Sequence, residues 1–291
     1  MSKLQQCTVV LQEFVGGARF EESIVRSNDN AYTRISIVMP SYNQVNFIER
    51  SILSVLNQSY PNLQFIIMDG GSTDGTLDVI RKYEKHLCWR SEPDRGQSDA
   101  LNKALMLADG ELVGWLNSDD VYFPGVFYRM HELSRQTPEA VLYTGSVARI
   151  DADDRLIRVP RHVPPSVRSL LFSFPMQSQG VFWRREVQSR AGVYNTDLHY
   201  AMDFDFWLKV LSHGSAEFIP ELVGGFRTYQ GTKTSSGWDR GQAELRAIRK
   251  QYGTDDATAR WRFRRNIMVL SDLFQRIFVI RRHCVTIATS K

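Results

Sequence analysis

Hydrophobic and polar positions between residues 34 and 124 alternate in a pattern that predicts strands separated by helices. The β-branched run Ile35–Met39, stopped by Pro40, is the first predicted strand. Apolar residues then recur at helical spacing from Phe47 to Asn57, and Asn46 is the predicted N-cap of that helix. The order repeats, with strands predicted at Leu63–Met68, Leu87–Ser91 and Leu112–Leu116, and helices at Asp74–Lys85 and Gln97–Ala108. Strands that alternate with helices of this length pair in parallel, so we expect an α/β fold with a three-layer sheet and these strand ends on one edge.

The chain after Pro124 has a looser pattern, which predicts a second half of mixed structure. The expected elements are a helix at 125–135, a strand at 140–148, a hairpin turn at 151–154, an irregular substrate-facing segment at 160–175, a strand from 180, a helix at 204–211, a strand at 222–227 and a polar loop at 230–237. Residues 1–33, at the other end of the chain, have the least regular pattern and are interpreted as a small extension that could form a hairpin. These patterns divide the chain into an extension (1–33), a domain of two halves (34–124 and 125–240) and a C-terminal tail (241–291).

The tail from Trp261 onward carries an apolar stripe surrounded by arginines. Its apolar residues are spaced by threes and fours, at Phe263, Ile267, Leu270, Phe274 and Ile277. This spacing predicts a basic amphipathic helix, which suits an anionic membrane surface. Packing on the domain, or contact within a homodimer, explains the same stripe equally well.

Composition narrows the class of protein without identifying it. The chain has 291 residues, of which 43% are hydrophobic and 23% charged, as in ordinary globular proteins, and this excludes disorder and fibres. Its three cysteines lie far apart, so neither a disulfide framework nor a zinc site is expected. No run of about 18 apolar residues and no cationic head before an apolar segment occurs. We therefore expect a cytoplasmic protein without a membrane span and without a nucleic acid partner, its net charge of +4 coming mainly from the tail.

Polar side chains at the end of the predicted strand Leu112–Leu116 are the first candidates for chemistry. The run Asn117-Ser118-Asp119-Asp120 follows this strand directly, at the edge where open α/β sheets bind ligands. Two adjacent carboxylates repel unless a cation lies beside them, and a hard ion such as Mg²⁺ or Mn²⁺ prefers oxygen ligands. One interpretation is a metal-bound phosphate. The other is that these residues only cap a helix that begins near Pro124.

Three polar segments follow the first, second and fourth predicted strands: Pro40–Asn43, Asp69–Thr76 and Asn117–Asp120. Together with the runs Ser51–Pro61 and Gly96–Lys103, they resemble the family 2 inverting glycosyltransferases of the GT-A fold. The resemblance is close over residues 34–124, looser to about residue 240, and absent from the tail. It implies a Rossmann-like three-layer sheet, an added antiparallel half that binds the acceptor, and a nucleotide-sugar donor.

The resemblance also implies roles for single residues in the donor half. Pro40, Tyr42, Asn43 and Asp69 would cradle the nucleoside, with the Asp69 carboxylate accepting a hydrogen bond from the base. Asp94 resembles a family position near the donor. From the residues alone, Asp69 beside two glycines and Asp94 after a proline are also ordinary turn residues.

The family's metal motif is Asp-X-Asp, and Asn117 occupies its first position here. The resemblance then assigns a divalent metal, Mn²⁺ or Mg²⁺, to Asp119. Asn117 would accept a hydrogen bond from the ribose, without contributing charge. Asp120 would help to place the sugar or the metal-bound waters.

An inverting transfer needs a base on the face of the sugar opposite the leaving diphosphate. The family places this base at the start of a helix in the second half, where Asp203 matches; the alternative is an acid that only favours the helix dipole. Asp205 is expected to be structural. The loop Arg227–Gly237 is predicted to close over the donor, with Arg227 and Lys233 contacting phosphate, and the alternative is an ordinary cationic surface loop.

Among the aromatic residues, Trp115, Trp183 and Trp207 fall on apolar faces and are expected in the core. Tyr122, just past the acidic pair, is a candidate for stacking or for acceptor contact.

The predicted activity is the transfer of one sugar from a nucleotide-diphosphate sugar, with a UDP-sugar favoured, to an acceptor hydroxyl with inversion. The basic tail suggests a lipid-linked glycan acceptor in bacterial surface polysaccharide assembly, with the protein peripheral on the inner face of the cell membrane. Nucleotidyl transfer would favour a glycine-rich, arginine-bearing loop after the first strand, and a polymerising synthase would carry Gln-X-X-Arg-Trp and spanning helices. A non-catalytic nucleotide- or sugar-binding scaffold is the remaining alternative, supported only by Asn117.

Overall fold

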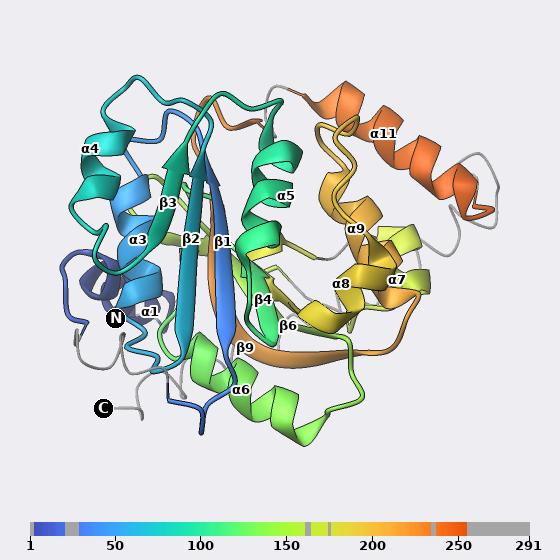
Figure 1. The fold of residues 1–291 in the computed structure, drawn as a ribbon, viewed down its shortest axis with the longest axis horizontal. Helices are drawn as coiled ribbons and strands as arrows, with labels where there is room; N and C mark the ends of the chain where they lie inside the picture. The colour runs from blue at the N-terminus through green and yellow to red at the C-terminus, as the bar shows by residue number, and fades with distance from the viewer. Residues whose placement is uncertain (1–2, 21–28, 161–163, 174–175, 234–236, 255–291) are drawn as a thin grey trace.

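A mixed sheet forms the centre of the domain, and its strand order explains why the predicted strand ends meet. The computed structural model describes residues 3–20, 29–160, 164–173, 176–233 and 237–254 (Figure 1). Nine strands have the order β3-β2-β1-β4-β8-β6-β9-β5, with β7 paired to β6. They are β1 (Ile35–Ser41), β2 (Leu63–Asp69), β3 (Cys88–Ser91), β4 (Leu112–Trp115), β5 (Val121–Tyr122), β6 (Leu142–Ile150), β7 (Leu156–Arg158), β8 (Val181–Arg184) and β9 (Ala216–Arg227).

Strands β1 to β4 form a parallel half-sheet, as the hydrophobic pattern predicts. β1 lies between β2 and β4, and both pairs are parallel. All seven residues of β1 are buried, as expected for a strand covered by helices on both faces. The register opposes Ser41 to Asp69 and Asp69 to Ser91. The carboxyl ends of β1, β2 and β3 therefore lie side by side on one edge.

The second half of the sheet is mixed. β8 is antiparallel to both β4 and β6, whereas β9 is parallel to β6 and antiparallel to β5. β9 runs over 12 residues and is longer than the strand predicted at 222–227. Because β5 pairs with Gly224 and Gly225, the end of β9 lies beside the acidic pair that precedes β5.

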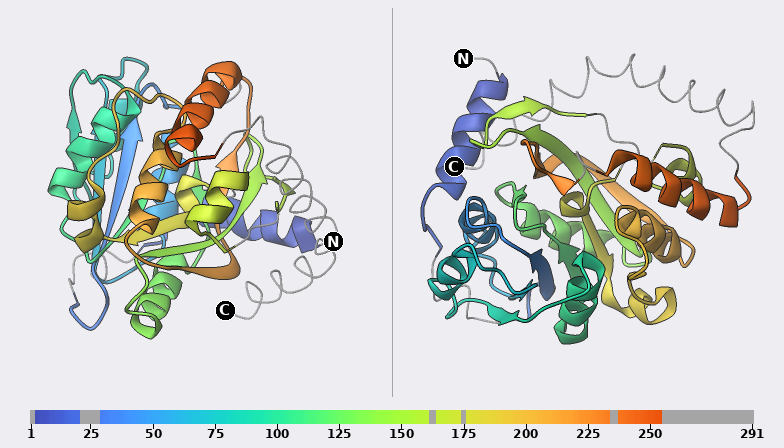
Figure 2. Two further views of the ribbon diagram at one scale, coloured as in Figure 1. Left: turned by 90° about the vertical axis from the view of Figure 1, so that its right-hand side faces the viewer. Right: turned by 90° about the horizontal axis from the view of Figure 1, so that it is seen from above.

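Helices cover both faces of the sheet and complete the three layers (Figures 1 and 2). Side chains of α3, α4 and α6 pack on one face, and those of α5, α7, α8, α9 and α11 on the other. Trp115, Trp183 and Trp207 lie in the second of these cores, as predicted. The helices are α1 (Lys3–Val15), α3 (Ile48–Leu56), α4 (Thr76–Arg81), α5 (Gln97–Leu107), α6 (Val126–Gln136), α7 (Val167–Ser173), α8 (Arg185–Ala191), α9 (Met202–Leu211) and α11 (Trp238–Gln251), and residues Ser178–Gly180 form a short 3₁₀ helix.

In the described part of the N-terminal extension, residues 3–15 form helix α1, and the hairpin considered for this segment is not found there. Leu11 and Val15 of α1 are buried in a third apolar cluster with Phe123 and Ile150. The Leu156 N–H donates a hydrogen bond of 3.0 Å to a threonine hydroxyl of α1, so the helix lies against β7 (Figure 2). Burial of one helical face here outweighs the strand preference of the Val9-Val10 pair.

Other helix boundaries also differ from the prediction. α3 begins after Phe47, and no side chain caps it, so Asn46 is not its N-cap. α4 ends at Arg81, earlier than the predicted end at Lys85. The segment 160–175, predicted to be irregular, contains α7.

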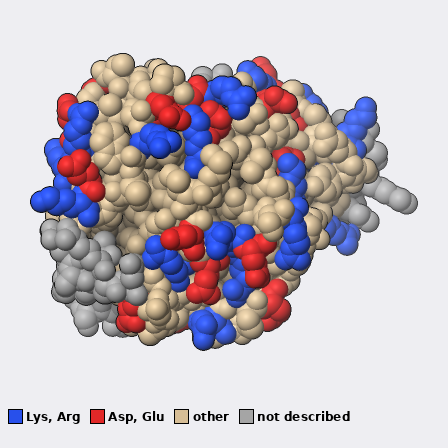
Figure 3. Space-filling view, in the orientation of Figure 1, with Lys and Arg blue, Asp and Glu red and all other residues tan. Residues whose placement is uncertain are grey.

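Part of the predicted tail packs on the domain. Ile248 of α11 is 3% exposed and joins the core beneath α9, whereas the amphipathic helix predicted from Trp261 lies outside the described residues. In the part of the chain that the structure describes, no helix has both the length and the apolar character needed to cross a membrane. On the face shown in Figure 3, lysine and arginine side chains are interspersed with acidic ones.

Candidate functional site

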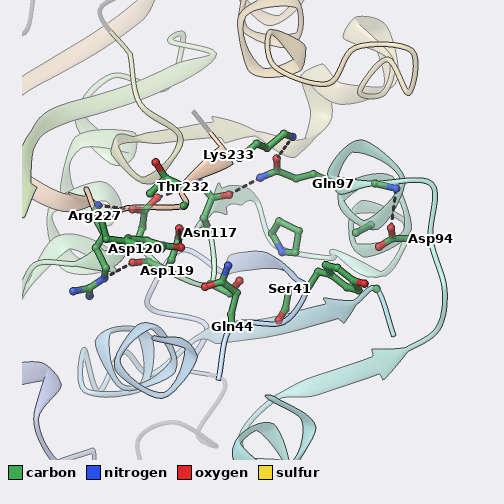
Figure 4. A pocket seen from close by; sticks show the side chains of 18 of the residues that line it. Ser41, Gln44, Asp94, Gln97, Asn117, Asp119, Asp120, Arg227, Thr232 and Lys233 are labelled. Atoms are coloured by element: carbon green, nitrogen blue, oxygen red, sulfur yellow. Dashed lines mark hydrogen bonds between the residues drawn. The ribbon is translucent and has the colours of Figure 1, made fainter. Parts of the chain in front are cut away.

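A pocket of about 650 Å³ is formed at the carboxyl edge of the parallel strands (Figure 4). Its lining comes from the last residues of β1 and β9, from the segments after β1, β2, β3, β4 and β9, and from the first turn of α5. The strand ends bring together residues that are far apart in the sequence. The predicted site residues that line it are Pro40, Tyr42, Asp94, Asn117, Asp119, Asp120, Arg227 and Lys233.

Asp69 ends β2 but does not line this pocket. It is 2% exposed, and its carboxylate accepts hydrogen bonds from the Gly71 and Ser72 N–H groups and from the Ser72 and Ser91 hydroxyls. Four donors hold the carboxylate in the turn. The structure thus shows the turn role that the residues alone allowed, and it places Asp69 beside the pocket wall.

Asn43 also joins two loops and is not part of the pocket lining. Its backbone has φ of 50°, in the left-handed region that asparagine tolerates. Its N–H donates to the Ser72 hydroxyl at 2.8 Å, and its side-chain oxygen accepts from the Thr73 N–H at 2.9 Å. These bonds tie the loop after β1 to the loop after β2.

Asp119 and Asp120 form a partly buried carboxylate pair at one end of the pocket. Asp120 is 1% exposed, and burial together with the Asp119 carboxylate raises its pKa well above the usual value. Its oxygens accept from the Arg227 backbone N–H at 2.8 Å and from the Asn117 side-chain amide at 3.1 Å. Burial also raises the pKa of Asp119, although a hydrogen bond of 3.0 Å from the Tyr229 hydroxyl opposes this. Two such carboxylates favour a cation beside them.

The carboxylate oxygens of Asp119 and Asp120 are suitable ligands for a divalent ion that binds together with a phosphate-bearing substrate. Among the described residues, no group of three or more His, Cys, Asp or Glu side chains is arranged as a complete metal site. Mg²⁺ and Mn²⁺ are, however, commonly held by one or two carboxylates together with substrate phosphates and water. Asp119 is partly exposed to the pocket and is the residue placed to hold such an ion.

Arg227 ends a strand, as the predicted strand at 222–227 has it, but it does not belong to the closing loop with which it was also grouped. It is the last residue of β9, and its side chain is fully buried. The guanidinium pairs with Asp154 and donates to the backbone oxygens of Asp119, at 2.6 Å, and Asp151, at 3.0 Å. These contacts make Arg227 a residue that positions the Asp119–Asp120 segment, not one that reaches a phosphate. Sequence reasoning missed this role because the pairing with Asp154 spans 73 positions.

Lys233 also lines the pocket, in the segment after β9. Its Nζ donates to Gln97 Oε1 at 2.9 Å and lies 5.5 Å from the centre of the Tyr200 ring. Gln97 in turn donates to Asn117 Oδ1 at 2.7 Å. A chain of hydrogen bonds therefore connects the segment after β9 with the carboxylate pair (Figure 4).

Asp203 is in the first turn of α9, as predicted, but does not line the pocket itself. Burial raises its pKa to about 7, although the Phe204 N–H and the nearby charge of Lys233 oppose this rise. A carboxylate with this pKa exchanges protons near neutral pH, which suits a general base. Asp205 instead pairs with Lys209 at 2.6 Å, in keeping with the structural role expected for it.

Tyr122 is a core residue, and the prediction of stacking or acceptor contact is wrong. Its side chain is fully buried, and its ring stacks on Phe182 with the centroids 5.6 Å apart. β5 is too short and too enclosed between its neighbours to present this side chain to a ligand.

Several lining residues were not predicted: Ser41, Gln44, Gly70, Gln97, Tyr229 and Thr232. Ser41, Gln44 and Gly70 lie within five positions of the end of a predicted strand, and this position was the available signal. Tyr229 and Thr232 follow the end of β9, within the predicted loop Arg227–Gly237, but neither was singled out there. Gln97 was within a recognised run, but its contact with Asn117 depends on the packing of α5 against β1.

A pocket at the carboxyl edge of parallel strands, with a carboxylate pair at one end, defines an α/β protein suited to a phosphate-bearing ligand. The chain belongs to glycosyl transferase family 2, whose model matches residues 36–198, more than half of its length.

Curated relatives agree with this assignment. A protein of Bacillus subtilis named as a teichuronic acid biosynthesis glycosyltransferase, TuaG, is 30% identical over 70% of this chain and 82% of its own. The hyaluronan synthase of Pasteurella multocida is 29% identical over 72% of this chain and 22% of its own. An uncharacterised glycosyltransferase of Rickettsia typhi is 25% identical over 69% of this chain and 66% of its own, so the chain spans just under two thirds of that relative.

Solved structures show the same GT-A fold. S. aureus TarS in complex with UDP-GlcNAc superimposes with a TM-score of 0.64 at 17% identity, over 84% of this chain and 73% of its own. The mannosyltransferase PcManGT from Pyrobaculum calidifontis, in complex with GDP-Man and Mn²⁺, gives 0.58 at 18% identity, over 88% and 77%. The GT-A fold predicted from the sequence is therefore confirmed.

Proposed function

We propose that this protein transfers a single sugar from a nucleoside diphosphate sugar, with a UDP-sugar favoured, to an acceptor hydroxyl with inversion. The observation that carries the proposal is the carboxylate pair Asp119 and Asp120 at one end of a pocket lined by both halves of the chain. A cation held by a diphosphate would offset the charge of this pair. TarS and PcManGT, which share the fold, are described with nucleotide sugars, and PcManGT also with Mn²⁺.

When bound, a divalent ion would offset the charge that develops on the leaving diphosphate. Asp119 would hold the ion. Asp120, fixed by Arg227 and Asn117, would place the donor sugar or bound water. Lys233 would add a positive charge at the pocket wall.

The acceptor hydroxyl must lose its proton as it attacks, and Asp203 is the proposed base. With a pKa of about 7, roughly half of this carboxylate is ionised at neutral pH. The positive charge of Lys233 favours the ionised form, and Lys233 also lines the donor pocket. The lysine is therefore close to the proposed base and also belongs to the lining of the pocket.

We assign the reaction to the assembly of a bacterial surface polysaccharide, with a lipid-linked glycan as acceptor. TuaG is named for teichuronic acid biosynthesis, and a second relative is a hyaluronan synthase, which supports a polymer as the product. The proposed location is cytoplasmic, peripheral on the inner face of the membrane through the basic tail, with a homodimer as an option. Deleting residues 259–291 should then weaken binding to anionic vesicles, and unchanged binding would count against the tail as an anchor.

The proposal is tested by incubating the full chain with Mn²⁺, a panel of nucleotide sugars and sugar acceptors. Release of nucleoside diphosphate should depend on one donor class and increase with acceptor, and NMR of the product should show an inverted anomeric configuration. Asp119→Ala and Asp203→Asn should each lower release at least about a hundredfold. Asp239→Asn, which changes an exposed acid in the first turn of α11, should not lower it. A protein that binds a nucleotide sugar but neither transfers nor hydrolyses it would support the scaffold alternative.

A further inference from the structure

Arg149 and Arg158 lie directly opposite each other on two antiparallel strands. The register pairs Arg149 of β6 with Arg158 of β7. Side chains paired in this way lie on one face of the sheet with Cβ atoms about 5 Å apart, and like charges in this arrangement are destabilising. Arginine does not lose its proton in proteins, so the repulsion persists at any physiological pH. An anion between the two guanidinium groups would relieve it.

Within the part of the chain that the structure describes, no acid neutralises this arginine pair. Neither Arg149 nor Arg158 forms an ion pair or a side-chain hydrogen bond with a described residue. The acids of the neighbouring turn have other partners, since Asp153 pairs with Arg155 at 2.9 Å and the buried Asp154 pairs with two further arginines. The positive charge of the pair is therefore left for a ligand.

The pair lies beside the pocket, next to one of its lining residues. The guanidinium of Arg149 is 4.1 Å from the centre of the Phe226 ring, and Phe226 lines the pocket. Phe226 is also the register partner of Arg149 on β9, so Phe226, Arg149 and Arg158 form a row across three strands. Burial lowers the pKa of Arg149, and the charge of Arg158 lowers it further, whereas Asp120 opposes this. The row therefore begins near the carboxylate pair.

The N–H groups of the pair can be reached by a ligand. Arg158 is exposed and Arg149 is half-buried, and no Arg149 nitrogen is among the described buried atoms that lack a partner. Stacking on an aromatic ring covers the face of a guanidinium and leaves its N–H groups free to donate in their own plane. The planar fork of these donors matches two oxygens of a phosphate.

We propose that Arg149 and Arg158 form a binding site for a phosphate group of the acceptor. A phosphate monoester presents three oxygens, so both guanidinium groups can bind it at once. Neither arginine lines the pocket, and both belong to the second half of the chain, which assigns the anion to the acceptor and not to the diphosphate of the donor. The inference rests on the proposed function, because it names the chemical class of acceptor in that reaction.

The first experiment measures binding of phenyl phosphate by calorimetry to the full chain saturated with UDP and Mn²⁺, with phenol as the uncharged comparison. Phenyl phosphate should bind and phenol should not, and added salt should weaken the binding. Arg149→Gln and Arg158→Gln should each weaken it about tenfold, and the double variant about a hundredfold. In transfer assays, the double variant should raise KM for a phosphate-bearing acceptor and leave KM for the donor unchanged.

Arg155→Gln is the matched control. It removes the same charge from the same hairpin, but Arg155 is paired with Asp153, so phenyl phosphate affinity should not change. Melting curves without ligand should show that the double variant is at least as stable as the unaltered protein, because a repulsion has been removed. If the double variant melts earlier, Arg158→Gln alone gives the test, since its side chain is exposed.

Three results would overturn the inference and leave the transferase proposal standing: no binding of phenyl phosphate by the unaltered protein, undiminished binding by the double variant, or exclusion of phenyl phosphate by UDP with Mn²⁺. The last would mean that the anion is the diphosphate of the donor. If binding is lost in the variants but the unaltered protein transfers sugar to no acceptor, the phosphate site stands and the proposed function fails.

Discussion

The side-chain NH₂ group of Gln97 donates a hydrogen bond of 2.7 Å to Oδ1 of Asn117. The side chain of Asn117 is therefore part of a hydrogen-bond network that depends on its being an amide. The same oxygen accepts the Trp115 indole N–H at 2.9 Å, and the Asn117 NH₂ group donates to Asp120 at 3.1 Å. A carboxylate at this position could accept but not donate. It would also add a third negative charge beside Asp119 and Asp120.

Asn117→Asp, which restores the family's Asp-X-Asp motif, is therefore expected to impair the protein. Loss of the hydrogen bond to Asp120 and repulsion between carboxylates should reduce the free energy of unfolding by about 1–3 kcal/mol and lower kcat/KM. Urea unfolding and initial rates at saturating Mn²⁺ check this. Asn46→Asp, at an exposed position, is the control and should change neither quantity. Higher activity in Asn117→Asp would show that the amide is a weakened metal ligand.

Arg227→Ala should act mainly on stability. Removing a fully buried guanidinium leaves the buried Asp154 carboxylate without this partner, although Arg50 also pairs with it at 2.9 Å, and such losses typically cost about 3–5 kcal/mol. Urea unfolding at constant m-value gives the change. The exposed Arg158→Ala serves as the comparison and should be close to neutral. If Arg227 instead contacted phosphate, stability would be retained and KM for the donor would rise.

The rate should depend on pH through Asp203. A base works in its ionised form, so kcat/KM should be low below pH 7, rise as pH passes about 7, and level off above it. Asp203→Asn should lower the rate by about a hundred- to ten-thousandfold and remove this limb. Lys233→Met, which removes a positive charge that favours ionisation, should shift the limb to higher pH, whereas Lys209→Met, on the same helix as Asp203 but paired with Asp205, should not.

The contribution of Asp203 to the stability of the folded protein should decrease as pH rises, whereas the reaction rate should increase. The pKa of Asp203 is about 7 in the folded protein, compared with the usual 3.8 of an aspartate exposed to solvent, as in the unfolded chain. The folded state therefore binds this proton more tightly than the unfolded state does. This contribution to stability is present at low pH and is lost as pH rises from about 4 to about 7. Melting temperatures of the protein and of Asp203→Asn across this range isolate the effect, because the asparagine variant lacks this contribution. Parallel curves for the two proteins would contradict the assigned pKa.

Removal of divalent metal should stop transfer. Chelation is expected to reduce nucleoside diphosphate release to background, because the leaving diphosphate then lacks its counter-charge, and added Mn²⁺ should restore it. Asp119→Ala should not be rescued by Mn²⁺ at any concentration that rescues the chelated protein. Full activity in the presence of chelator would show that the carboxylate pair has another role.

The parallel half of the fold was predictable because its strands are short, β-branched and buried on both faces, as β1 and β2 are. Such runs, separated by helical spacing, have few alternative arrangements. The N-terminal helix α1 was not predictable, since its pattern is weak and its burial depends on Phe123 and Ile150, more than a hundred positions away. The full length of β9 was not predictable either, because it is set by pairing with β6, which is distant in the sequence.

Most of the predicted site residues line the pocket, but the different roles of these residues were not predicted. Sequence order placed Asp69, Asp94, Asn117 and Asp119 at strand ends, which is where α/β sheets bind ligands. It could not show that four donors saturate the carboxylate of Asp69, which does not line the pocket.

By itself, then, the amino-acid sequence determined the order of strands and helices and the edge at which polar side chains gather, because these follow from local hydrophobic periodicity. Tertiary structure alone decided which polar atoms are already occupied and which remain available. Arg227 is the clearest case: in the sequence it borders a polar loop, yet in the fold Asp154 and three backbone oxygens bind its guanidinium. Hydrogen bonds between distant segments form only when packing brings their partners together, so the chemistry of this site depends on contacts that no local pattern encodes.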